Sequence, residues 1–244
     1  MSICSNCDKV IVSSECALTD LLSFSPQHAQ KAELLRFVAN PVPLADAANL
    51  MDLQRIYNFD RPYFLLPNQF WSHKNHRVVL KALRILNQQN TPFLVLATGA
   101  AKDYRNPSFF QKLMQYAAEC GVLDNFRVLG QIPFDHLAGL MRDAIALINP
   151  SLFEGWSTSV EEAKSTGKQI LLSDIPVHRE QAPERGIFFP PEDPDALAEA
   201  MVVACNGFDL EYDAAMQDKA RAGFPERQRT FGENYRRVVN LLDV

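Results

Sequence analysis

The chain has 244 residues, of which 47% are hydrophobic and 22% are charged, and this balance suits a folded protein with a sizeable core. The formal net charge of −5 argues against a broad basic face for nucleic acid, although a few local cations could bind a small anionic ligand. No apolar run approaches the roughly 18 residues that a membrane span requires, and the N-terminal residues MSICSNCDKV lack the apolar core of a signal peptide. We therefore expect a cytoplasmic protein, with peripheral attachment to the inner face of a membrane as an alternative.

The five cysteines are scattered along a chain without a secretion signal, so we expect reduced thiols. Cys4 and Cys7 form a C-x-x-C pair, and Cys16 could be a third zinc ligand. A closed structural zinc site needs four ligands, however, and the nearest histidine is His28. We therefore predict no metal site.

The first 49 residues differ in organisation from the rest of the chain. The segments KVIVSS, CALTDLLSF and KAELLRFVA are typical of a strand, a helix and a strand. Two prolines follow in NPVPLADAAN and indicate a linker over Asn40–Asn49. We therefore assign residues 1–49 to the end of one structural unit and its linker.

From residue 50 to residue 224, short β-type runs alternate with amphipathic segments of helix length. One such segment is KNHRVVLKALRILNQQ, in which Val78, Val79, Leu83 and Leu86 recur at helical spacing. This alternation predicts an α/β fold, a doubly wound, Rossmann-like parallel sheet covered by helices on both faces. The predicted strands are Tyr63–Leu66, Phe93–Ala97, Arg127–Gly130, Ile145–Asn149, Gln169–Ser173 and Gly186–Phe189.

The last segment, residues 225–244, is predicted to be a separate amphipathic helix. Phe231, Tyr235, Val238 and Leu242 recur at i, i+4, i+7 and i+11, so they form one apolar stripe. Such a stripe needs a partner, either the N-terminal segment or a second copy of the chain.

The stretch SLFEGWSTSVEEA follows the apolar run AIALINP, so it joins a buried strand to a helix. Ligands of open α/β sheets lie at the carboxyl ends of the strands, and the free amides at a helix N-terminus attract anions. Gly155 would let the backbone approach a ligand, and the amides of residues 156–159 could face a phosphate. This junction therefore predicts a site for an anionic ligand.

Three glutamates lie in the same stretch. Thr158 with Glu161 could form a capping box, as could Ser159 with the next glutamate. Only one of these boxes can form, so one glutamate can be structural while the other is free. Glu154 in the loop and Glu162 in the helix could border one pocket and accept hydrogen bonds from sugar hydroxyls. Alternatively, the two adjacent glutamates are ordinary first-turn acids that face the helix dipole.

The spacing of Glu154 and Glu162 resembles the E-x7-E motif of the retaining, metal-independent glycosyltransferases of family four, which have the two-domain GT-B fold. The segment LFEGWSTSVEEAKSTGKQILLSDIPVHREQ is similar to that family over its whole length. YFLLPNQFWSHKNHRVVLKAL resembles the start of the family's C-terminal, donor-binding domain, and VLGQIPFDHLAGLMRDAIALINPS resembles the part where the nucleoside base rests. The likeness runs from Lys9 to Leu242. It implies that residues 1–49 end an acceptor-binding N-terminal domain, that residues 50–224 bind the nucleotide sugar, and that residues 225–244 cross back toward the first domain.

The resemblance also implies roles for individual residues. Glu162 would hold the ribose hydroxyls, Glu154 would face the transferred sugar, and Lys74 would neutralise the diphosphate leaving group. Many members have an arginine six residues before this lysine, where this chain has Asn68, so part of that charge stabilisation is either lost or supplied by another cation such as Arg179. The backbone amides that would bind the distal phosphate and the sugar are those of Gly155, Trp156, Ser157 and Thr158.

The base would lie against two further loops. The loops near Gly99 and Gly130 also follow predicted strands, and Ile132 and Leu137 could form an apolar floor. The resemblance implies no cofactor, because the nucleotide-diphosphate sugar is the donor substrate.

Two of the five histidines flank the lysine of the HKN segment. His73 and His76 could therefore contact the ligand, and we include His73 in the predicted nucleotide-sugar site. We expect His28, His136 and His178 in surface positions or loops.

The predicted function is retaining transfer of a sugar from a nucleotide-diphosphate sugar to a glycan or lipid-linked acceptor, with this chain supplying the donor-binding half. The predicted partners are the nucleotide sugar, such an acceptor, and either a missing N-terminal domain or a second copy bound through the C-terminal helix, but no nucleic acid. Because the family's reaction needs both domains, we expect this chain alone to bind the donor without turnover.

Three alternatives remain open at the sequence level: a non-catalytic donor-binding fragment, a sugar-nucleotide epimerase-like protein and a glycoside hydrolase. The hydrolase would also use two carboxylates, but it leaves the lysine and the phosphate-ready helix start unexplained. A serine hydrolase is excluded, because EGWSTS lacks the G-x-S-x-G elbow.

Overall fold

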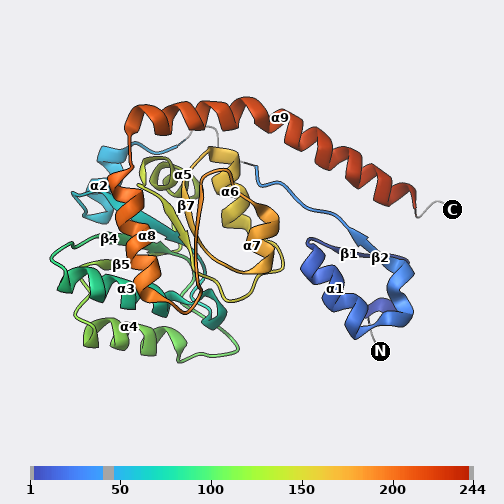
Figure 1. Ribbon diagram of the computed structural model, residues 1–244, viewed down its shortest axis with the longest axis horizontal. Coiled ribbons are helices and arrows are strands. Elements are labelled where there is room, and N and C mark those ends of the chain that lie inside the picture. The colour runs from blue at the N-terminus through green and yellow to red at the C-terminus, as the bar shows by residue number, and fades with distance from the viewer. Residues whose placement is uncertain (1–2, 41–46, 242–244) are drawn as a thin grey trace.

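The computed structural model describes residues 3–40 and 47–241. A large α/β unit holds a six-stranded parallel sheet in the order β5-β4-β3-β6-β7-β8, and a small N-terminal unit holds the parallel pair β1-β2 (Figure 1). No helix in these described ranges is both long and apolar enough to span a bilayer. The predicted doubly wound, Rossmann-like sheet is confirmed.

The strands of the large sheet are β3 (Tyr63–Pro67), β4 (Leu94–Thr98), β5 (Phe126–Gly130), β6 (Leu147–Asn149), β7 (Ile170–Ser173) and β8 (Gly186–Phe189). Each begins and ends within two residues of its predicted position. The agreement follows from burial on both faces, which makes a central parallel strand read as a continuous apolar run bounded by turn residues.

Alternate residues of the central strands face two separate cores. Phe64 and Leu66 of β3 pack with α3 (His76–Gln88), α4 (Phe109–Glu119) and α8 (Pro194–Asn206) on one face. Tyr63 and Leu65 pack with α2 (Leu50–Tyr57), α5 (Phe134–Asp143) and α6 (Thr158–Thr166) on the other. Helices therefore cover both faces, and the carboxyl ends of the strands remain at one open edge.

The N-terminal unit contains β1 (Val10–Val12), α1 (Glu15–Phe24) and β2 (Ala32–Leu34), as the sequence predicts. The Lys31 ammonium donates to the carbonyl oxygens of Cys4 and Cys7 at 3.0 and 2.7 Å, so the C-x-x-C segment is held by a lysine. Within the described residues, no group of three or more histidine, cysteine or acidic residues could hold a metal ion. The predicted linker falls mostly on residues 41–46, which lie outside the described ranges.

The N-terminal unit is attached to α7 (Pro176–Gln181) of the large unit. The Glu180 carboxylate accepts hydrogen bonds from the backbone amide of Glu15, at 2.9 and 3.0 Å, and from the Arg36 guanidinium at 2.6 Å. This carboxylate therefore binds the N-terminus of α1, where the helix dipole favours negative charge. Figure 1 shows α1 and α7 side by side across the junction of the two units.

The final helix, α9, is longer than predicted, because it runs without interruption from Leu210 to Asn240 and contains Pro225. A proline inside a helix removes one backbone hydrogen bond and costs about 3 kcal/mol. Two ion pairs join α9 to the large unit on either side of the proline: Asp213, near the start of α9, binds Lys168 at 2.7 Å, and Arg227, just after the proline, binds Glu161 at 2.7 Å. The boundary predicted at residue 225 therefore falls inside a helix.

The apolar stripe of α9 lies partly against the N-terminal unit. Val238 is buried, and Phe231 lines a cleft of ≈ 520 Å³ together with Leu34 and Leu35. Tyr235 stays half exposed, and Leu242 lies outside the described residues. Figure 1 shows α9 extending from the large unit over β2, so the stripe has a partner within the chain. Self-association through this helix stays a prediction.

Candidate active site

The carboxyl ends of β3 and β6 bring Lys74 and Glu154 together. Lys74 ends a short 3-10 helix, Ser72–Lys74, that follows β3, and Glu154 lies in the loop between β6 and α6. The Lys74 ammonium donates to Glu154 Oε1 at 2.6 Å, and the backbone amide of Leu152 donates to the carbonyl of His73 at 2.8 Å. Both charged side chains are largely buried, which strengthens their attraction relative to a surface pair.

A buried network of polar side chains contacts the Glu154 member of this pair. Ser151 Oγ lies 2.7 Å from both Glu154 Oε1 and Asn149 Oδ1, so its single proton can bind either oxygen. Asn149 Nδ2 donates to the hydroxyls of Ser157 and Ser159 at 2.6 and 3.1 Å. The sequence analysis did not identify Ser151 or Asn149 as residues that support Glu154. Asn149 offered a signal, because it is a polar residue at the end of the apolar run AIALINP.

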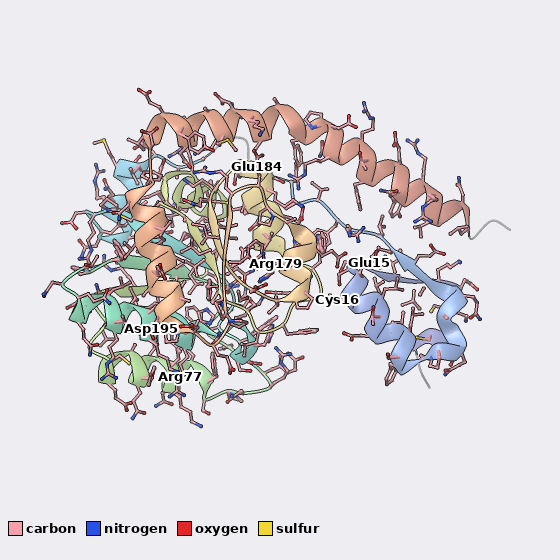
Figure 2. The ribbon with its side chains drawn as sticks, in the orientation of Figure 1. Glu15, Cys16, Arg77, Arg179, Glu184 and Asp195 are labelled. Atoms are coloured by element: carbon pink, nitrogen blue, oxygen red, sulfur yellow. The ribbon has the colours of Figure 1, made fainter. Side chains whose placement is uncertain are left out.

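Asn68, which the resemblance aligns with an arginine, belongs to the same network. Its Nδ2 donates to Asn149 Oδ1 at 3.3 Å, and the side chain is buried. Arg179 is no evident replacement for the missing charge, because Asp174 binds its guanidinium through two oxygens at 2.6 and 2.7 Å. In Figure 2, Arg179 lies on α7 near Glu15 and Cys16 of the N-terminal unit.

Some residues at the start of α6 are exposed, whereas others already form hydrogen bonds within the protein. Gly155 and Thr158 are exposed, and a Cβ at Gly155 would meet no atom within 4 Å. The Ser157 amide, by contrast, donates to Gln181 Oε1 at 3.1 Å, and Gln181 Nε2 donates back to the Ser157 carbonyl at 2.9 Å. A ligand contact at the Ser157 amide would therefore have to displace Gln181.

The side chain of Trp156 turns toward the N-terminal unit. Its indole N–H donates to the carbonyl of Phe37 at 3.1 Å, and its ring packs with Ile175, Val177 and Cys16. Trp156 thus joins the two units, and its backbone amide stays a predicted phosphate donor.

Neither predicted capping box forms. α6 begins after Ser157, whose side chain makes no cap hydrogen bond. Glu161 is 1% exposed and accepts hydrogen bonds from Arg227, Lys164 and Gln181 at 2.7, 3.1 and 3.2 Å. The interpretation of Glu161 as a helix-capping acid is therefore wrong: the buried carboxylate joins α6, α7 and α9 because it is the counter-ion of two cations.

Glu162 has the opposite environment. Its carboxyl group makes no hydrogen bond within the part of the chain that the structure describes, and burial raises its pKa from 4.5 to about 7. A partly desolvated carboxyl group with unfilled acceptor sites can accept hydrogen bonds from ligand hydroxyls. Of the two adjacent glutamates, Glu162 is therefore the one available to a ligand.

The predicted base-binding residues lie near the ends of β4 and β5. Gly130 has φ +73°, its carbonyl accepts a hydrogen bond from the Gly99 amide at 2.9 Å, and a Cβ there would meet no atom within 4 Å. Ile132 and Leu137 are partly buried against the core that contains Leu140. These contacts leave Gly130 open and give Ile132 and Leu137 a packing role, while their contact with a base stays a prediction.

The histidines differ from prediction in two places. His76 is fully buried and stacks on Phe70 with ring centroids 4.5 Å apart, so it is not accessible to a ligand in this conformation. His178, expected at the surface, is also fully buried in α7, with Nδ1 2.8 Å from the Ser173 carbonyl. We expected His178 at the surface because of its polar neighbours in the sequence, but its contact with Ser173 buries it. His73 is half-buried beside Lys74, in keeping with its predicted position.

Glu154 also borders a cleft between the two units. This cleft has a volume of ≈ 470 Å³ and is lined by Glu15, Cys16, Thr19 and Asp20 of α1 and by residues 152–154 and 175–177 of the large unit. The Lys74–Glu154 pair therefore lies at the carboxyl edge of the sheet, and its Glu154 side also lines the cleft between the two units.

Comparison with known proteins gives one family and several related folds. Residues 53–222 match the family described as glycosyl transferases group 1. The chain is 28% identical over 131 residues to the O-antigen chain mannosyltransferase RfbU of Salmonella typhimurium, which covers 54% of this chain and 35% of the relative. It is 24% identical over 157 residues to the O-antigen chain mannosyltransferase B of Escherichia coli, which covers 64% of this chain and 40% of the relative.

Solved structures show the same fold at low identity. Sucrose-phosphate synthase from Thermosynechococcus elongatus superposes with a TM-score of 0.73 at 21% identity, over 97% of this chain and 59% of that one. HepE from Anabaena, solved in complex with UDP-glucose, superposes with a TM-score of 0.73 at 15% identity, over 97% of this chain and 64% of that one. The chain thus spans about two fifths or less of its curated relatives and about three fifths of these structures.

Proposed function

The chain belongs to the glycosyl transferases group 1 family, and on this premise we propose that it binds a nucleotide-diphosphate sugar and supplies the donor-binding half of a retaining sugar transfer to a glycan or lipid-linked acceptor. The observation that carries the proposal is the Lys74–Glu154 pair at the carboxyl edge of the sheet, beside the start of α6. Nucleotides bind at this edge in open α/β folds.

The chemistry of the pair suits cleavage of a bond between a sugar and a diphosphate. Negative charge develops on the departing diphosphate, and a fixed ammonium group stabilises that charge better than mobile water does. Lys74 would meet this charge directly, and the N-terminal dipole of α6 would add to it. Glu154 would accept hydrogen bonds from the hydroxyls of the transferred sugar and, as the counter-ion of Lys74, would hold the ammonium in place until the donor binds.

Glu162 would hold the ribose. Its carboxyl group has unfilled acceptor sites, and vicinal hydroxyls can donate two hydrogen bonds to one carboxylate. Because two of the matched relatives are named mannosyltransferases, a mannosyl donor is the first sugar to test.

We propose that no cofactor or metal ion is required, because cationic side chains of the protein, Lys74 among them, and the α6 dipole can meet the diphosphate charge. Donor binding should accordingly be unchanged by EDTA. A loss of calorimetric affinity in EDTA that magnesium restores would contradict this part of the proposal.

Binding by the purified chain tests the assignment. The change Lys74→Ala should weaken the affinity for UDP, GDP or ADP, whichever binds best, by at least about tenfold, because a charge-assisted contact contributes about 1.5–3 kcal/mol. Lys81→Ala is the matched control, since Lys81 is an exposed lysine on the neighbouring helix α3. An unchanged calorimetric affinity in Lys74→Ala would overturn the proposed function.

Transfer is expected to require an acceptor wall across the cleft from Glu154. Positioning donor and acceptor together contributes about 7–11 kcal/mol to such reactions, so we expect this chain by itself to bind donor with negligible transfer. Release of free sugar from a simple glycoside would favour a hydrolase instead, and release of an altered sugar nucleotide would favour an epimerase.

A further inference from the structure

Lys74 alone leaves the proposed diphosphate site short of positive charge. The ammonium is already paired with Glu154 at 2.6 Å, so the two side chains are together neutral. A nucleoside diphosphate carries at least two negative charges, and a helix N-terminus supplies only about half a positive charge. Asn68, just after β3, is a buried neutral amide bound to Asn149 and adds no charge.

A second loop lies against the segment that carries Lys74. The residues after β4 are joined to those after β3 by two hydrogen bonds, from the Phe70 amide to the Ala100 carbonyl at 3.1 Å and from the Ala100 amide to Gln69 Oε1 at 2.6 Å. Gly99 has φ +129°, and a Cβ there would lie 2.5 Å from the Asn68 carbonyl oxygen. Only glycine permits so close an approach, so the sequence fixes the second loop beside the first.

Arg105 is held on this second loop with its outer nitrogens unused. The Asp103 carboxylate, 3% exposed, accepts hydrogen bonds from the Arg105 amide at 3.0 Å and from Nε at 3.3 Å. The guanidinium lies over the Trp71 ring, 5.0 Å from its centroid. Within the described ranges, Nη1 and Nη2 of Arg105 make no hydrogen bond, and the side chain is 49% exposed.

Trp71 places this guanidinium close to the Lys74 segment. The Trp71 and His73 ring centroids are 5.7 Å apart, and His73 directly precedes Lys74. Burial lowers the pKa of His73, and the positive charges of Lys74 and Arg105 lower it further, against the opposing charge of Glu154. The imidazole therefore lies within the field of both cations.

We propose that Arg105 is a second diphosphate-binding residue, which donates hydrogen bonds from Nη1 and Nη2 to phosphate oxygens while Lys74 binds the same group from the β3 side. A planar guanidinium presents two parallel N–H donors that match two phosphate oxygens. Asp103 and Trp71 hold it in position before the ligand arrives, which reduces the entropy lost on binding. The inference rests on the proposed function, because it names a further contact to the same ligand.

Calorimetry with the whole chain tests this contact. The probes are UDP, GDP and ADP with their matching nucleoside monophosphates. For the diphosphate that binds best, Arg105→Gln should weaken affinity about tenfold, and Arg105→Lys should weaken it less, because charge is kept and the fork is lost. The affinity for the matching monophosphate should change by less than about threefold.

Two controls separate a direct contact from a general loss of charge. Lys102→Gln removes a cation from the same exposed loop. Arg77→Gln removes an arginine of α3 whose guanidinium lies over the Tyr116 ring, 4.2 Å from its centroid. Figure 2 shows Arg77 beside α4, far from α7. Each control should change the diphosphate affinity by less than about twofold.

The outcomes distinguish this inference from the proposed function. If Lys74→Ala weakens diphosphate binding and Arg105→Gln does not, the Arg105 contact is overturned and the proposed function stands. If Arg105→Gln weakens monophosphate and diphosphate binding equally, or if Lys102→Gln has the same effect, a direct contact with the diphosphate is also overturned. If the wild-type chain binds none of the nucleotides, the proposed function fails and the inference fails with it.

Discussion

At the amino end of the sheet, Lys168, Arg185 and Asp213 satisfy one another, whereas at the carboxyl end Lys74, Glu154 and Glu162 retain hydrogen-bonding capacity. Lys168 Nζ donates to Asp213 and to the carbonyls of Arg142 and Ala144 at 2.7, 2.9 and 2.6 Å. Asp213 also accepts from Arg185 at 2.6 Å and from Gln217 at 2.9 Å. The carboxyl group of Glu162, in contrast, makes no hydrogen bond to any of the described residues, although burial raises its pKa.

The difference separates charge that stabilises the fold from charge that is available to a ligand. A buried ion pair whose remaining donors and acceptors are all filled can hold helices in place, but it offers nothing to bind. A partly buried acid without a partner lowers stability until a ligand supplies the missing hydrogen bonds. Stability measurements should therefore tell the two ends of the sheet apart.

The largest expected effect is at the amino end. Asp213→Asn would leave Lys168 and Arg185 buried without a counter-ion, and breaking such a pair costs about 3–5 kcal/mol. The free energy of unfolding in urea should fall by about that amount, while nucleotide affinity measured on the folded protein should hardly change. Asp218→Asn, on the same helix at an exposed ion pair, should cost less than about 0.5 kcal/mol. A loss of less than about 1 kcal/mol in Asp213→Asn would show that water reaches both cations.

The next effect concerns Glu161, which lies beside Glu162 in α6. Protein groups fill its acceptor sites, as they do for the charges at the amino end. Glu161→Gln should lower the free energy of unfolding by about 2 kcal/mol, because Arg227 and Lys164 would lose their shared counter-ion. Glu226→Gln, at an exposed pair on α9, is the control. If the variant instead loses nucleotide affinity at unchanged stability, the assignment of structural and binding roles to the two glutamates is reversed.

Unlike Glu161→Gln, the change Glu162→Gln should raise the free energy of unfolding. Above neutral pH the wild-type protein keeps a charged carboxylate in a partly desolvated position, so the neutral amide should raise the free energy of unfolding, by an amount on the order of 1 kcal/mol. The same change should weaken nucleotide binding at least about fivefold, since the amide oxygen can accept from one ribose hydroxyl and the amide nitrogen cannot accept from the other. Urea unfolding and calorimetry on one preparation measure both effects.

The stability difference between the wild type and Glu162→Gln should depend on pH in one direction. The unfolded chain releases the Glu162 proton near pH 4.5, and the folded chain keeps it to about pH 7. The contribution of this group to stability therefore decreases as the pH rises between these values and is constant above them. The stability advantage of Glu162→Gln over wild type should grow across the same interval. An advantage that does not depend on pH would mean that the carboxyl group titrates normally.

Most of the fold could be predicted from sequence because it depends on local patterns. The strands are continuous apolar runs, and the helices that cover them carry apolar residues at helical spacing. Helix α9 begins before the predicted boundary at residue 225 and continues through Pro225, and Asp213 and Arg227 on either side of this proline bind residues distant in sequence. Nothing in the neighbouring sequence reports those contacts.

The candidate site divides in the same way. Glu154 and Lys74 lie 80 residues apart in sequence, and their expected proximity came from the family resemblance together with the rule that ligands bind at the carboxyl ends of parallel strands. The roles of Glu161 and Gln181 depend on which helix faces which, and a spacing rule for capping boxes misassigned the first of them. Ser151 was missed because a supporting hydroxyl has no sequence signature of its own. Asn149 did carry a signal, as a polar residue at the end of an apolar run, but the prediction did not use it.

The smallest expected effect tests this support at the carboxyl end. Ser151→Ala removes the hydroxyl that lies 2.7 Å from both Glu154 and Asn149. Each partner keeps another contact, since Glu154 still accepts from Lys74 and Asn149 still accepts from Asn68. The free energy of unfolding should therefore fall by only about 1 kcal/mol.

Nucleotide binding should show more of the Ser151 effect than this stability change suggests. Without the hydroxyl, Glu154 can turn with Lys74 as a pair, so the ammonium is less well positioned and diphosphate affinity should fall about threefold. Ser151→Thr, which keeps the hydroxyl, should restore affinity if the added methyl group fits. Equal diphosphate affinities in the wild type and Ser151→Ala would mean that the 3-10 helix alone positions Lys74. The carboxyl end of the sheet would then not depend on buried hydrogen bonds as the Lys168–Asp213 cluster at the amino end does.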